Sequence, residues 1–304
     1  MMSQTVLILG GNGKIGSHAA DAFWNAGWRV RHYDRSTNDM TAAAMGADVI
    51  VNGLNPPLYR DWARNIPMIT DQVIAAAKAS GATVILPGNV YNFGRHEGEM
   101  NETTPQAAHT RKGRIRIAME DAYRASGVQT IVLRAGNFID PNGNGDIMSM
   151  LIMRAAASKK LTSPGNADAM QAYAYVPDWA RAARMLAEKR DSLSSFEDIA
   201  FPGHSFTLNQ LKSQVEATTG MAFKVTSFPW WAVRLASPFV ELAREMLEMR
   251  YLYSLNHWLG AGKFDELLPD FRPTPLADVM CVGLPADINP DQSVRSSGKA
   301  VAAE

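Results

Sequence analysis

The chain has 304 residues, of which 46% are hydrophobic and 20% charged, as in a folded globular protein. Its 30 Lys and Arg residues balance 30 Asp and Glu residues, which argues against binding nucleic acid or an anionic membrane through bulk charge. One cysteine, Cys281, excludes an intrachain disulfide framework. No apolar run has the length of a membrane span or of a signal segment, so we expect a soluble, cytoplasmic protein.

Short apolar runs alternate with helical patterns over the first two-thirds of the chain. Strands are predicted at Thr5–Leu9, 29–33, 48–51, 83–86 and 130–133, and helices at 15–26, 70–80 and 114–126. Because this alternation is typical of βαβ units, we expect an α/β fold of the Rossmann type, a doubly wound parallel sheet with helices on both faces.

The pattern changes after Pro141, where loops become rich in Gly, Asn and Pro. Helical patterns at 179–189 and 229–258 predict a smaller, mostly helical substrate region at 161–286. Residues 1–160 would form the Rossmann domain, and a strand near 173–176 would return to it. The small and polar residues of 287–304 predict a loose tail.

The loop after the first strand reads GGNGKIG and contains the pattern G-x-x-G-x-x-G. Glycines here allow a tight turn, a close approach of the backbone to a pyrophosphate, and close packing of the following helix on the sheet. The start of that helix then offers free N–H groups to phosphates. The loop therefore makes 1–160 a candidate NAD(P)-binding domain. The candidate cofactor contacts in the loop are Gly10, Gly13, Lys14, Ile15 and Gly16.

Two adjacent residues at the end of the second strand give opposite indications about the cofactor. Asp34 lies 18 residues after Gly16, where an acidic side chain binds the adenosine ribose and repels a 2′-phosphate. Arg35 could instead pair with that phosphate. We favour NAD, because a carboxylate is costly to place against a phosphate, and keep NADP as the alternative.

Several segments resemble the short-chain dehydrogenase/reductase superfamily, on the extended side that includes sugar-nucleotide epimerases and dehydratases. The resembling segments are 47–52, 85–94, 133–138, 175–178 and 272–276. The resemblance implies further cofactor contacts at Asn52, Gly53 and Asn137. In sugar-nucleotide relatives an Arg-Asp pair often precedes the return strand. This sequence has Gln171 and Ala172 there, which weakens the case for a nucleotide-sugar substrate, although Arg154 or Arg181 could take the place of that arginine.

The catalytic positions depart from that family, which usually carries Ser or Thr on a strand and Tyr-x-x-x-Lys on the next helix. Alignment on Glu120 places Arg116 at the lysine position and Lys112 at the tyrosine position, on one helix face. Asn89 or Tyr91 takes the place of the serine. Such departures match the atypical subgroup of the superfamily.

Each candidate catalytic residue also has a structural interpretation. Arg116 could grip the cofactor ribose or be a solvated helix charge. Lys112 could act as an acid or base if it is desolvated, or be a surface lysine. Tyr91 could donate a proton or be a packed aromatic, and His96 and His109 are alternative acids.

These residues predict an NAD(P)-dependent oxidoreductase or epimerase/dehydratase-like enzyme that acts on a small polar substrate. The segment between Glu102 and Glu120 contains several basic residues and no acidic one. This indicates that it binds an anionic group of the cofactor or an anionic substrate. The alternative is a non-catalytic NAD(P)-binding sensor or scaffold. The aromatic stripe at 228–258 could be a pocket lid or a homodimer contact. Three acids, Glu241, Glu245 and Glu248, offset its basic residues, which argues against membrane binding.

Overall fold

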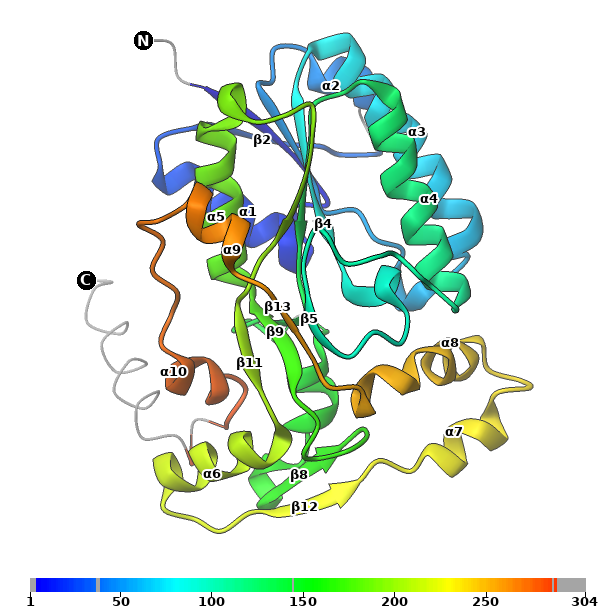
Figure 1. The fold of residues 1–304 in the computed structure, drawn as a ribbon, viewed down its shortest axis with the longest axis vertical. Helices are drawn as coiled ribbons and strands as arrows, with labels where there is room; N and C mark the ends of the chain where they lie inside the picture. Colours follow the sequence, from blue (N-terminus) through cyan, green and yellow to red (C-terminus); the bar gives the residue numbers. More distant parts are fainter. Residues whose placement is uncertain (1–3, 37–38, 144, 286, 289–304) are drawn as a thin grey trace.

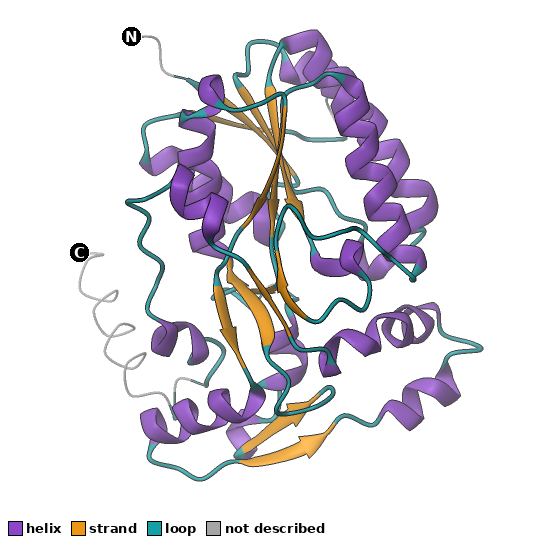
Figure 2. Cartoon of the chain, viewed as in Figure 1, coloured by secondary structure: helices purple, strands orange, loops and turns teal. Residues whose placement is uncertain are grey.

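The computed structural model describes residues 4–36, 39–143, 145–285 and 287–288. It confirms the predicted α/β fold: Figure 2 shows a twisted sheet between two groups of helices, with smaller sheets and further helices beyond one end of it. No helix among the described residues combines the length and the apolar character that a membrane crossing needs. Most of the expected tail, 289–304, lies outside the described residues.

The central sheet has six strands in the order β2-β1-β3-β4-β6-β10, and every neighbouring pair is parallel. Its strands are β1 (Thr5–Leu9), β2 (Arg29–His32), β3 (Val49–Asn52), β4 (Thr83–Gly88), β6 (Thr130–Arg134) and β10 (Phe196–Ala200). Strand β1 is therefore flanked by the two strands that follow it in the sequence. The connections run in opposite directions from this point, which makes it the topological switch point of the sheet.

Alternating side chains of the strands supply two separate cores. In β1, Val6 and Ile8 face α1 (Lys14–Asn25) and α5 (Val176–Glu188), whereas Leu7 and Leu9 face the other layer. That layer consists of α2 (Met40–Ala44), α3 (Trp62–Ser80) and α4 (Arg111–Ser126). Figure 1 shows α3 and α4 on the side of the sheet opposite α1 and α5. Continuous apolar strands are expected when both faces of a parallel sheet are covered.

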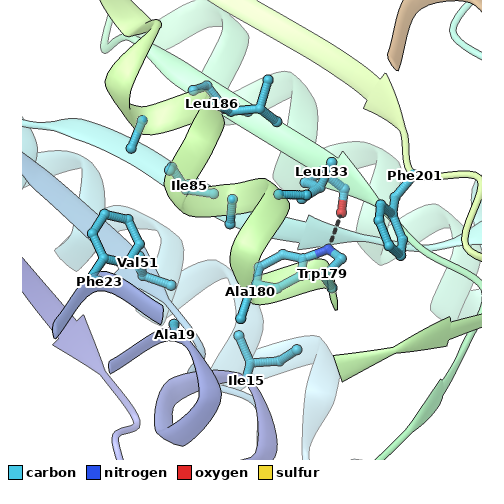
Figure 3. Close-up of a cluster of buried hydrophobic side chains, with 14 of the residues drawn as sticks. Ile15, Ala19, Phe23, Val51, Ile85, Leu133, Trp179, Ala180, Leu186 and Phe201 are labelled. Carbon is cyan, nitrogen blue, oxygen red and sulfur yellow. Dashed lines mark hydrogen bonds between the residues drawn. The ribbon is translucent and has the colours of Figure 1, made fainter. Parts of the chain in front are cut away.

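The packing of α1 against α5 fixes the helix that leads into β10. Ile15, Ala19 and Phe23 of α1 meet α5 over the sheet, as Figure 3 shows. The Trp179 indole donates a hydrogen bond from Nε1 to the Leu133 carbonyl oxygen at 3.0 Å. This bond satisfies the one polar atom of a fully buried ring and attaches α5 to β6.

The return strand lies in a different sheet from the one that we expected. Gln171–Tyr175 forms β9 of a three-stranded sheet with β7 (Asn137–Ile139) and β11 (His204–Phe206). It is the next helix, α5, that returns to the Rossmann sheet, and β10 is the sixth strand there. The expectation for 173–176 is therefore wrong about the sheet, because pairing depends on distant partners that the local pattern does not contain.

Two further pairs of short strands complete the second region. They are β8 (Lys160–Ser163) with β12 (Lys224–Ser227), and β5 (Gly98–Met100) with β13 (His257–Leu259). The remaining helices are α6 (Leu208–Thr219), α7 (Trp230–Ala236), α8 (Glu241–Met249), α9 (Gly262–Leu267) and α10 (Leu276–Met280). The helical pattern at 229–258 is thus divided into α7, α8, a 3-10 turn η6 (Arg250–Ser254) and β13. Pro238 follows the end of α7, because proline cannot continue a helix.

Candidate functional site

Three glycines lie close together at the carboxyl ends of β1 and β3, at the switch point, where open parallel sheets bind ligands in a crevice. Gly10 has φ +74°, a left-handed conformation that favours glycine. A Cβ on Gly16 would collide with the Gly10 carbonyl oxygen, and one on Gly53 would lie 2.9 Å from the Leu9 carbonyl oxygen. Three glycines thus allow the two strand ends and the start of α1 to approach closely.

The first turn of α1 is open to an anion. Gly13 precedes α1 without a side-chain hydrogen bond to the helix end, and the first turn has no acidic residue. The first N–H groups of a helix lack partners within it, and the helix dipole attracts negative charge there. Ile15 is buried in the core, so only its backbone belongs to this loop.

Lys14 and His18 of α1 hold the segment that follows β7. Lys14 Nζ donates to the Gly145 carbonyl oxygen at 2.8 Å, and His18 Nε2 lies 2.9 Å from Asp140 Oδ1. Burial lowers the pKa of Lys14, while Asp146 and Asp140 act in the opposite direction. The segment after β7 is therefore fastened beside the glycine loop, an attachment that the sequence did not reveal.

Asp34 and Arg35 are both exposed just beyond β2. The Asp34 carboxylate accepts from the Ser36 amide at 2.9 Å and from the Ser36 hydroxyl at 2.6 Å. His32, at the end of β2, lies so close to Gly11 that a Cβ there would collide with its Nδ1. The end of β2 is therefore adjacent to the glycine loop, where both residues were expected.

Asn52 holds the turn at the end of β3. It is buried, its Nδ2 donates to the Tyr123 hydroxyl at 3.2 Å, and its Oδ1 accepts from the Leu54 amide at 3.2 Å. Gly53 N donates to the Leu9 carbonyl oxygen at 3.0 Å, which ties this turn to β1. Asn52 thereby fixes the position of Gly53 in the crevice.

Two tyrosines meet near the end of β4. Asn89 caps the short helix η2 (Val90–Phe93), and its Oδ1 accepts from the Tyr91 amide at 3.0 Å. The Tyr91 hydroxyl lies 3.3 Å from the Tyr59 hydroxyl. Burial, and then Tyr59, raise the pKa of Tyr91 well above its usual value, whereas Arg116 acts to lower it. Tyr91 therefore carries its phenolic proton at neutral pH.

Tyr59 belongs to a segment with an unusual backbone. Leu58, Tyr59 and Asp61 all have positive φ, at 53°, 61° and 47°. Residues other than glycine occupy this region at a cost, and such strain concentrates at functional sites. Sequence reasoning missed Tyr59, although the N-P-P-L-Y run directly after the third strand was a visible signal for a special turn.

Arg116 carries a buried donor without a partner. Its guanidinium lies 5.5 Å from the centre of the Trp62 ring, and its Nη1 lies 3.4 Å from Met119 Sδ. Its buried Nε has no hydrogen-bond partner among the described residues. Burial lowers the pKa of Arg116, and the charge of Glu120 opposes this effect. An unsatisfied buried N–H of this kind indicates a missing acceptor, and a bound ligand would supply one.

Lys112 is fully buried and ion-paired, so the interpretation as a surface lysine is wrong. Its Nζ contacts Glu245 Oε2, lies 2.7 Å from Glu248 Oε2, and sits 4.8 Å from the centre of the Tyr59 ring. Arg111 adds a bond to Glu245 Oε1 at 2.6 Å. Glu245 is buried, so these two acids of α8 hold α8 against α4.

A second buried ion network supports Asn89. Arg134 donates to Glu120 at 2.8 and 3.2 Å and to Asp198 at 2.5 and 3.1 Å. Its Nη1 also donates to the Asn89 carbonyl oxygen at 2.7 Å. Burial lowers the pKa of Arg134, but the two carboxylates raise it further, so the group stays charged. Glu120 thus helps to position Asn89, because it holds Arg134, which bonds the Asn89 carbonyl oxygen.

Asn137 lies apart from the tyrosine pair, in a cavity of about 20 Å³. Its polar neighbours there include Gln171, Tyr173 and Tyr253, and Gln171 Oε1 has no partner among the described residues. The structure thus places Tyr91 and Lys112 beside Tyr59, and Arg116 beside Trp62, whose ring packs edge-on against Tyr59. Asn137 lies in a separate cavity.

The two histidines are placed differently from one another. His96 Nε2 lies 3.0 Å from the Glu99 carbonyl oxygen, and His96 is exposed. The His109 ring packs edge-on against Tyr251, with 4.5 Å between ring centres. Neither contact involves Tyr91 or Asn89.

Solved structures of similar fold include proteins in complex with NAD and with UDP-sugars. MoeE5 in complex with UDP-glucose and NAD is 15% identical, covers 96% of this chain and 99% of its own, and has a TM-score of 0.71. UDP-glucuronic acid 4-epimerase from Bacillus cereus in complex with UDP-glucuronic acid and NAD is 16% identical, covers 92% of this chain and 98% of its own, and has a TM-score of 0.71. UDP-glucose 4-epimerase from Brucella ovis in complex with NAD is 17% identical, covers 93% of this chain and 98% of its own, and has a TM-score of 0.71. At these identities the likeness shows the fold.

The sequence itself identifies the family. A search of curated proteins finds no match. A family model described as the NAD dependent epimerase/dehydratase family matches residues 40–200, more than half of the chain. This match agrees with the resemblance noted in the sequence and with the parallel sheet. The chain belongs to the NAD dependent epimerase/dehydratase family.

Proposed function

We propose that this protein binds NAD in the crevice at the switch point and transfers hydride to or from a small polar substrate, as an oxidoreductase or epimerase. The observation that carries the proposal is the contact of Gly10, Gly16 and Gly53, where any side chain would push the backbone apart. A tight glycine turn beside an uncapped helix start fits a dinucleotide diphosphate.

We assign the parts of the cofactor to residues at the glycine loop and to Arg116. The amides that follow Gly13 would bind the diphosphate, and Asp34 would bind the adenosine ribose. Arg116 would donate its unpartnered Nε to an oxygen of the cofactor, on the side of the nicotinamide ribose. The solved neighbours with NAD support this choice of cofactor. The exposed Arg35 keeps NADP as the alternative.

Bound NAD would supply the hydride acceptor, and this chain's residues would hold the substrate and manage its proton. Tyr91 would donate the proton from its hydroxyl oxygen, with Tyr59 at 3.3 Å as its relay partner. Asn89 and Asn137 would bind polar groups of the substrate. Lys112 is committed to Glu245 and Glu248, so we assign it to holding α8 and not to proton transfer.

A single-turnover assay tests this proposal. The purified protein would be mixed with NADH and a panel of small carbonyl compounds, and oxidation of NADH would be followed by absorbance. We expect turnover with at least one polar carbonyl compound, and loss of that turnover in Tyr91→Phe. If NADH binds but no compound on a broad panel oxidises it, the enzyme proposal fails.

The second candidate function is a non-catalytic NAD(P)-binding sensor. It is favoured by the commitment of Lys112 to ion pairs at the position where the family carries its tyrosine. It predicts saturable cofactor binding without turnover, so the same assay separates the two functions.

Titration of NAD(H) and NADP(H) tests the choice of cofactor. We expect tighter binding of NAD(H) by the wild type and little change in Arg35→Ala. If NADP(H) binds more tightly and loses that advantage in Arg35→Ala, the assignment of NAD is wrong.

A further inference from the structure

A groove of about 640 Å³ lies outside the cofactor crevice, between the start of α4 and the segment from α8 to η6. Its walls include Thr110 and Arg111 at the start of α4, and Arg95 in the turn before β5. Figure 1 shows α8 lying beside this end of α4. Small-molecule sites usually have volumes of about 300–1,000 Å³, so the groove has the right size for a metabolite.

The charged side chains of the groove leave a positive excess. Arg95, Arg250 and one acid, Glu97, are exposed there, and the Arg250 guanidinium lies 5.3 Å from the centre of the Trp230 ring. The other acid, Glu248, is already neutralised because Lys112 bonds it through both Nζ and the backbone amide. Two guanidinium groups therefore face one uncompensated carboxylate, an arrangement that favours an anion.

Tyr251, which lines the groove, has a hydrogen-bond donor without a partner in the described part of the chain. The Tyr251 hydroxyl is buried and has no partner among the described residues. The Arg95 guanidinium lies 5.4 Å from the centre of the Tyr251 ring, and the His109 ring packs against its edge. Leu247 and Leu255 also line the groove and provide apolar surface. A buried hydroxyl without a partner on a ring that Arg95 covers indicates a ligand oxygen.

We infer that this groove binds a small phosphate-bearing organic molecule. Arg95 and Arg250 hold the phosphate oxygens, the Tyr251 hydroxyl donates to one of them, and the leucines contact the carbon part. The site goes beyond the proposed function, because none of its lining residues is assigned to the cofactor or to proton transfer. The groove is linked to Lys112 through Glu248, which bonds Lys112, and through Arg111, which shares Glu245 with it.

Calorimetric titration of the full chain with inorganic phosphate and with phenyl phosphate, at constant ionic strength, tests the inference. We expect both to saturate one site, with phenyl phosphate binding more tightly because its ring contacts apolar surface. Loss of a charge-assisted hydrogen bond predicts roughly tenfold weaker binding in Arg95→Met and in Arg250→Met. Arg95→Lys should recover part of the affinity, and Tyr251→Phe should lower it.

Arg64→Met is the matched control, because Arg64 is an exposed arginine on α3, outside the groove. It should bind phenyl phosphate like the wild type, and every variant should keep the wild-type affinity for NADH. Absence of saturable binding by the wild type would overturn the inference. Equal affinity of the wild type, Arg95→Met and Arg250→Met would overturn it as well. Unchanged NADH binding in either case would leave the proposed function intact.

Discussion

Replacement of Lys112 by methionine tests whether this residue is structural or catalytic. The lysine side chain is 0% exposed, and its partners Glu245 and Glu248 are 6% and 21% exposed. Lys112→Met would leave two carboxylates facing an apolar side chain. Removing one partner of a buried ion pair costs about 3–5 kcal/mol, a large part of the roughly 5–15 kcal/mol that stabilises a typical domain.

Urea unfolding followed by tryptophan fluorescence measures this loss. The matched control is Lys212→Met, because Lys212 pairs with Glu216 at 2.9 Å on the partly exposed surface of α6, where water screens an ion pair and its loss changes stability little. Neutralising both acids as well, in Lys112→Met with Glu245→Gln and Glu248→Gln, should restore part of the stability. A loss below about 1 kcal/mol in Lys112→Met, together with abolished turnover, would refute the structural assignment.

Three further substitutions test other parts of the account. Arg116→Met should weaken NADH binding about tenfold or more in a fluorescence titration, because a charge-assisted hydrogen bond is worth about 1.5–3 kcal/mol. An unchanged affinity would show that Arg116 does not bind the cofactor. Tyr91→Phe should lower kcat while the NADH affinity stays the same, and full activity would exclude Tyr91 as the proton donor. Burial raises the pKa of Glu248, but hydrogen bonds from Lys112 bring it below its usual 4.5. The Glu248 carboxylate therefore stabilises the fold above pH 4.5, and this stabilisation is lost as the pH falls through its folded-state pKa. The difference in the free energy of unfolding between wild type and Glu248→Gln should shrink in acid. A difference that does not change with pH would contradict this.

Local patterns were sufficient to predict the Rossmann half of the fold. Thr5–Leu9 and its glycine loop are adjacent in sequence, and their chemistry follows from strand, turn and helix in succession. Helix α3 was predicted to start at 70 but starts at Trp62, because Pro67 lies within it and resembles a helix boundary. Local signals therefore gave the element types correctly and some of the boundaries incorrectly.

The environment of the candidate catalytic residues could not be predicted, because it comes from distant parts of the chain. Spacing placed Lys112 and Arg116 on one helix face, but the acids that bind Lys112 lie 133 and 136 residues away. Tyr59 reaches Tyr91 across 32 residues through a strained turn. No periodicity in the sequence contains such contacts, so the same residues could equally be read as surface charges or as a catalytic pair.

The central claim is that NAD occupies the glycine-backed crevice at the switch point. A calorimetric titration of NADH against the wild type and Gly16→Ala tests it most directly, because a methyl group at Gly16 collides with the Gly10 carbonyl oxygen. Circular dichroism would establish that the variant is folded. The account predicts saturable binding by the wild type and loss of binding by folded Gly16→Ala. Equal affinity of the two proteins, or no binding of NADH or NADPH by the wild type, would contradict it.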